Sequence, residues 1–72
     1  MKVYYDKQVD SLYIEFNQEK PDGVVEIQNG LNIDMLPDGR IGGIEILDAS
    51  KKIDIQTLLT YSIDAEILPA IR

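Results

Sequence analysis

The chain has 72 residues, with 13 acidic side chains against seven basic ones, and carries a formal net charge of −6. This length suits one small domain, and the negative charge disfavours direct contact with nucleic acid or with an anionic membrane surface. The chain contains neither cysteine nor histidine, which excludes disulfides, thiol nucleophiles and imidazole metal ligands.

The hydropathy pattern indicates a protein without a membrane span. No apolar run approaches 18 residues, and the N-terminus alternates apolar and polar residues instead of following a charged segment with an apolar one. We therefore expect a cytoplasmic protein with neither a signal peptide nor a membrane span. We expect no bound cofactor and no metal site as the main interpretation of the sequence.

Alternating apolar residues predict a first hairpin from residues 1–5 and 12–17. The apolar sets of the two strands are in phase when Tyr5 lies opposite Leu12. The connecting loop then contains two aspartates, Asp6 and Asp10, whose carboxylates can accept backbone N–H bonds within the turn. A structural role for these aspartates is favoured over a metal-binding role.

A second hairpin is predicted from residues 24–28 and 31–36, which meet around an Asn-Gly pair. A two-residue turn would mix the faces of the two strands. A three-residue loop with Gly30 at positive φ instead pairs Ile27 with Leu31 and keeps the apolar residues on one face. We therefore predict the three-residue loop.

A fifth strand follows a Pro-Asp-Gly turn and contains two adjacent glycines, Gly42 and Gly43. Regular alternation would send Ile41 to one face and Ile44 and Ile46 to the other. A β-bulge at the glycines shifts the phase once and predicts that all three isoleucines are buried on one face. A phosphate-binding loop is the functional alternative, but no Gly-x-Gly-x-x-Gly spacing and no following Lys-Ser/Thr support it.

The last third of the chain predicts a helix over residues 50–61, capped by Asp48 or Ser50, and a short arm over residues 62–72. The predicted fold is α+β: an antiparallel five-stranded β-meander over residues 1–49, with the helix packed on one face. The whole chain forms one domain, residues 1–72. The positions with predicted structural roles are Gly30, Gly39, Gly42, Gly43, Asp48 and Ser50.

Three motifs of the first 50 residues form a recognisable combination. They are the Tyr5-Asp6 opening followed by Asp10 to Ile14, the turn from Asn29 to Asp34, and the segment from Asp38 to Ser50. Together they resemble the short prokaryotic family DUF2283. The resemblance covers roughly residues 1–50 and implies no established activity. It also implies an antitoxin-like role, because some family members have the gene context of small antitoxins, and it therefore suggests a partner protein.

The predicted registers assign one set of side chains to the sheet face opposite the apolar one. We call this set the outer face: Tyr4, Tyr13, Glu15, Glu26, Asn32, Asp34, Glu45 and Leu47. Asn32 lies opposite both Glu26 and Glu45, so its amide can bridge carboxylates that would otherwise repel each other. A solvated face is the simplest interpretation. A magnesium or calcium site of Glu26, Asp34 and Glu45, and a carboxylate pair acting as acid and base, are the chemical alternatives.

These features predict a small non-enzymatic interaction protein whose acidic, tyrosine-bearing outer face binds a basic protein, such as a small ribonuclease toxin. A self-associating structural module is the first alternative. A divalent-metal-dependent binder or small enzyme is the second. We also expect a homodimer, because apolar residues of the arm and of the outer face exceed what one predicted helix can cover.

Overall fold

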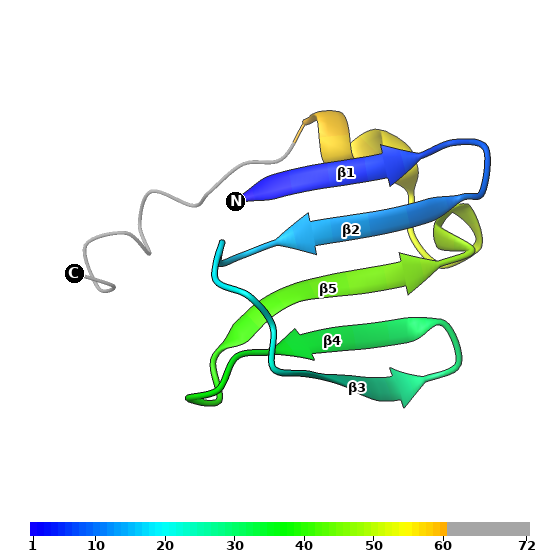
Figure 1. Cartoon of the computed structure of the whole chain (residues 1–72). Helices are drawn as coiled ribbons and strands as arrows, with labels where there is room; N and C mark the ends of the chain where they lie inside the picture. The colour runs from blue at the N-terminus through cyan, green and yellow to red at the C-terminus, as the bar shows by residue number, and fades with distance from the viewer. Residues whose placement is uncertain (61–72) are drawn as a thin grey trace, which may run out of the picture.

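The computed structural model describes residues 1–60, which form a single antiparallel sheet and two short 3₁₀ helices (Figure 1). The strands are β1 (Lys2–Asp6), β2 (Ser11–Glu15), β3 (Gly23–Gln28), β4 (Leu31–Met35) and β5 (Ile41–Leu47). Their spatial order is β1-β2-β5-β4-β3. The predicted meander is therefore wrong, because β2 pairs with β5 and β3 lies at the far edge.

The link between β2 and β3 produces this order by passing the ends of β5 and β4 (Figure 1). The backbone N–H groups of Phe16 and Asn17 donate to the Gly42 carbonyl at 2.9 and 3.1 Å. Further along the link, the N–H of Asp22 donates to the Met35 carbonyl at 2.8 Å. These bonds hold the link to the sheet and place β3 beside β4.

The local registers follow the predicted phases. Tyr5 lies opposite Leu12 in the first hairpin, as predicted. In β5, Gly43 lies opposite Asp34 while Ile41 lies opposite Met35, so Gly42 is an extra residue and the predicted bulge is confirmed.

The Gly30 turn is confirmed in conformation but not in length. Gly30 has φ 81° and Gly39, in the turn before β5, has φ 89°. Gln28, however, lies opposite Leu31, and the register shifts around Ile27. The predicted pairing of Ile27 with Leu31 is therefore wrong: a tighter turn is compensated by an irregularity one residue earlier.

The predicted helix over residues 50–61 is also wrong. Within the described residues the chain forms only two 3₁₀ helices, η1 (Ala49–Lys51) and η2 (Ile55–Leu59), so the fold is not α+β. Asp48 has left-handed dihedrals and makes no side-chain cap, while Asp54 is extended and accepts a hydrogen bond from the Gln56 N–H. These two aspartates divide the segment, and its β-branched residues have low helix propensity.

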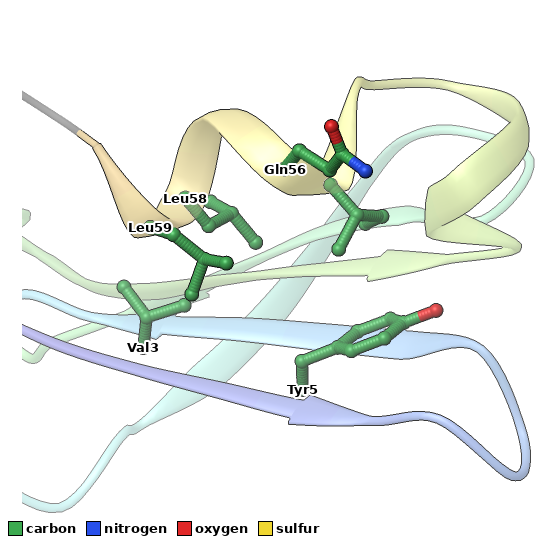
Figure 2. Close-up of a pocket in the computed structure, with 6 residues that line it drawn as sticks. Val3, Tyr5, Gln56, Leu58 and Leu59 are labelled. Carbon is green, nitrogen blue, oxygen red and sulfur yellow. The ribbon is translucent and has the colours of Figure 1, made fainter.

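Few side chains are fully covered in the described part of the chain. The buried apolar residues are Leu12, Leu36 and Ala49. Ile41 is 41% exposed and Ile44 and Ile46 are only partly buried, so the predicted burial of all three is wrong. The reason is that η2 packs beside Val3 and Tyr5 of the edge strand β1 (Figures 1 and 2), whereas Ile41 belongs to β5, which β2 separates from β1.

The predicted arm, residues 62–72, and the last residue of the predicted helix lie outside the described residues. Residues 1–60 contain no helix long and apolar enough to cross a membrane.

Candidate protein-interaction face

One continuous row of side chains crosses all five strands on the outer face. Cross-strand registers place its members opposite one another in the order Tyr4, Tyr13, Glu45, Asn32 and Glu26. Side chains that are directly opposite in an antiparallel pair lie close enough to interact. The predicted position of Asn32 between two glutamates is therefore confirmed, and the row is extended to β1 and β2 by the β2–β5 pairing.

The amide of Asn32 holds one of these glutamates in place. Its Nδ2 donates to Glu45 Oε1 at 3.1 Å. Glu26, on the other side of Asn32, is exposed on the edge strand β3. The row therefore presents one fixed carboxylate at its centre and one freely solvated carboxylate at its end.

Tyr13 connects two strands that are not neighbours. Its hydroxyl donates to Asp34 Oδ2 at 2.8 Å, although β5 lies between β2 and β4. The ring lies directly over Gly43, because a Cβ added there would collide with Tyr13 Oη and Cζ. Glycine at this position therefore leaves the space that the phenol needs to reach Asp34.

The environment of Tyr13 keeps its hydroxyl protonated. Desolvation, the hydrogen bond to Asp34 and the neighbouring carboxylates raise the pKa of Tyr13 to about 12. The hydroxyl is thus a hydrogen-bond donor to Asp34 at neutral pH, and the Asp34 carboxylate keeps acceptor capacity for a partner.

The remaining residues of the outer face surround this row. Tyr4 packs against Tyr13 with ring centroids 6.3 Å apart at 34°, and it remains 50% exposed. Leu47 is 40% exposed at the end of β5, and Glu15 is partly buried at the end of β2. Together the eight residues carry four carboxylates and two tyrosines, and Lys2 lies opposite Glu15 on the same face.

A second polar cluster joins the first hairpin to η1. Asp10 has φ 54° and accepts hydrogen bonds from the Tyr5 hydroxyl at 2.6 Å and from the Ser50 hydroxyl at 2.6 Å. These two bonds, the Ser50 bond first, lower the pKa of Asp10. Ser50 therefore ties η1 to the first hairpin, and its predicted role as a helix cap is wrong.

The sequence identified the outer face but missed this Asp10 cluster and the contact of Tyr13 with Gly43. A glycine inside a strand indicates close approach of another group, so Gly43 carried a usable signal. The Asp10–Ser50 contact joins residues 40 positions apart, and no local pattern indicates it.

A groove lies on the other face of the sheet, and its lining is mostly apolar. Figure 2 shows this groove between β1 and η2. Its volume is about 390 Å³, and it is lined by Val3, Tyr5, Ile55, Gln56, Leu58 and Leu59. Within the described part of the chain, its lining includes no carboxylate or lysine. Among residues 1–60, no group of three or more acidic side chains is arranged to hold a metal ion.

A single antiparallel sheet with two short 3₁₀ helices and an acidic, tyrosine-bearing face defines a small β-sheet domain. The family model described as "Protein of unknown function (DUF2283)" matches residues 2–50. The chain belongs to this family, as the sequence motifs predicted. No curated protein and no solved structure matches the chain.

Proposed function

We propose that the domain is a non-enzymatic interaction module that binds a basic protein through its outer face. The observation that supports this proposal is the row from Tyr4 to Glu26, in which Tyr13 is oriented by its bond to Asp34 and Glu45 by its bond to Asn32. Side chains that are already ordered lose little conformational freedom on binding.

The chemistry of the face matches a cationic surface. Lysine and arginine side chains would pair with its four carboxylates, and the exposed ring of Tyr4 would supply an anchor that also accepts a cation over its face. The net charge of −6 would accelerate encounter with a positively charged partner. A small basic ribonuclease toxin has this character, and we propose a cytoplasmic location accordingly.

The experiment uses the tagged full-length chain as bait in its native cytoplasm, with bound proteins identified by mass spectrometry and the affinity of a recovered basic protein measured by calorimetry. Glu26→Lys and Glu45→Lys reverse charges in the row, and we expect each to weaken binding by about tenfold or more. Asp22→Lys is the matched control, because Asp22 is exposed in the link just before β3 and is not one of the eight outer-face residues.

Two results would contradict the proposal. One is that no basic protein binds the bait at low salt. The other is that a recovered partner binds the Glu26→Lys and Asp22→Lys variants equally well, since its docking surface would then lie elsewhere.

A further inference from the structure

The strand β1 is an edge strand of the sheet that residues 1–60 form. Within residues 1–60 it pairs with β2 on one side and with no strand on the other (Figure 1). Such an edge leaves the N–H and C=O of every second residue free to pair with another strand. β1 contains neither proline nor a bulge, and its register with β2 is regular from Lys2 to Asp6.

The other edge is less suited to accept a strand. The register of β3 shifts around Ile27, and such irregularities distort an edge. Self-pairing of β3 around Glu26 would also place two carboxylates against each other. The two edges of this sheet are therefore not equivalent.

The sequence of β1, Lys-Val-Tyr-Tyr-Asp, is complementary to itself when read antiparallel. A two-fold axis at Tyr4 places Lys2 opposite Asp6 of a second copy, and Asp6 opposite Lys2 of that copy. On the inner side of the sheet the same register pairs Val3 with Tyr5 twice. Opposite charges and aromatic–β-branched pairs are both favourable across strands.

Neighbouring registers lack this complementarity. If both copies are to present the same sheet face on the same side, one residue of β1 must lie opposite the same residue of the second copy, on the two-fold axis. An axis at Val3 sets Lys2 against Tyr4, and an axis at Tyr5 sets Tyr4 against Asp6. Only the Tyr4 register pairs both charged ends of β1.

We propose that a second copy of the chain adds its β1 antiparallel to this edge, with Tyr4 at the two-fold axis, and joins the two sheets into one. Apolar surface at the same edge supports this assembly. Val3 is 41% exposed and Leu59, beside it in the groove of Figure 2, is 86% exposed. The second copy would bring its own Tyr5 against Val3 and cover part of this surface.

The first experiment is a charge swap, read by sedimentation equilibrium of the full-length chain at low salt. We expect the wild type to reach twice the 8.1 kDa of one chain. Lys2→Glu and Asp6→Lys each place like charges opposite one another at both ends of the β1–β1 interface. Each should therefore weaken dimerisation by about tenfold or more. The double variant restores opposite charges and keeps the net charge of −6, so it should dimerise like the wild type.

Controls distinguish loss of the β1–β1 charge pairs from general effects of charge and folding. Lys20→Glu makes the same charge change as Lys2→Glu in the β2–β3 link, and it should leave the dimer intact. Asp6 also accepts a hydrogen bond from the Gln8 N–H at 3.0 Å, which Asp6→Lys removes. Restoration in the double variant cannot come from that turn bond, because the bond stays absent.

The second experiment uses the absence of cysteine from the chain. Tyr4→Cys would face its own copy at a spacing close to that of a disulfide, so it should form a covalent dimer in a glutathione redox buffer. Val24→Cys is the control on the other edge; Val24 is 64% exposed and lies opposite Asp34, on the same face as Tyr4. It should remain a covalent monomer.

A chain that stays at 8.1 kDa up to millimolar concentration would overturn the proposal. So would a dimer in which the double variant fails to recover, or in which Tyr4→Cys and Val24→Cys cross-link equally. Failure of the basic partner to bind the outer face would leave the mass of the dimer unchanged, so the two proposals fail separately.

Discussion

Ser50 donates its hydroxyl to Asp10 Oδ2 at 2.6 Å and its backbone N–H to Asp10 Oδ1 at 3.0 Å, across 40 positions of sequence. The backbone of the same turn adds a third bond, from the Ala49 N–H to the Asp10 carbonyl at 3.0 Å. The chain after β5 is thereby fixed to the loop between β1 and β2. Ala49, between the bonded groups, is fully buried.

Ser50→Ala should make stability less sensitive to acid. The Ser50 hydroxyl is the largest cause of the lowered pKa of Asp10, so its loss returns that pKa toward the ordinary 3.8. A carboxylate with a lowered native pKa stabilises the fold above its unfolded pKa and loses that contribution as the pH falls through the native pKa. The Ser50→Ala variant should therefore be less stable at pH 7 and lose less stability between pH 7 and about pH 3.

Urea midpoints at the two pH values measure this difference. Ser11→Ala is a control with the same chemical change in β2. If the wild type and Ser50→Ala lose the same stability between the two pH values, the Ser50 hydroxyl does not lower the pKa of Asp10.

Gly43→Ala should destabilise the fold by about 1–3 kcal/mol, because the added methyl group has no room. Its Cβ would collide with the Tyr13 ring and would lie 2.8 Å from the Ile14 carbonyl oxygen, which belongs to the backbone and cannot turn aside. Gly23→Ala is the matched control, since a Cβ there meets no atom within 4 Å. Chemical denaturation compares the two, and equal stability would mean that Tyr13 does not lie over Gly43.

Tyr13→Phe should reduce the loss of stability that the fold undergoes as the pH rises into the alkaline range. The pKa of Tyr13 is about 12 in the fold and near 10 in a free tyrosine. Since the native pKa is the higher one, this group's contribution is complete below about pH 10 and is lost as the pH rises towards 12. The variant lacks that contribution, so its stability should fall less over this interval.

Absorbance of ionised tyrosine gives a direct measure of the same group. The native wild type should show a component titrating near pH 12 that disappears in Tyr13→Phe and persists in Tyr4→Phe. Loss of that component in Tyr4→Phe instead would reassign the raised pKa.

Gly30→Ala and Gly39→Ala test the two turns. Both glycines have positive φ, so each substitution should cost about 1 kcal/mol. Gly30→Ala should cost more, because its methyl group displaces the Lys52 ammonium, which donates to the Gly30 and Leu47 carbonyls. In a Lys52→Met background the two costs should become equal; a difference that persists would exclude the lysine as its cause.

Sequence patterns predicted contacts that local turns determine. The phase of alternation and the positions of turn residues fix how Tyr5 meets Leu12 and how Asn32 meets Glu26 and Glu45. The bulge at Gly42 followed from the same reasoning. These contacts, and with them most of the outer face, were therefore accessible from the sequence.

The sheet order was not accessible, because no local signal specifies that β2 pairs with β5. That pairing depends on a link whose backbone bonds to Gly42 are visible only in the fold. The helix prediction failed for a related reason: spacing of apolar residues suggested a helix, but Asp48 and Asp54 adopt non-helical dihedrals. Asp48 leads into the turn that brings Ser50 to Asp10.

Folding speed depends on how far apart in sequence the contacting residues lie. β1 pairs with β2 through a short loop, and β3, β4 and β5 pair in succession through short turns. Both groups can form from nearby residues. Among the strand pairings of residues 1–60, the β2–β5 pairing is the one that closes a long segment of chain. We therefore expect this step to carry most of the loop-closure entropy and to limit the rate at which the sheet forms.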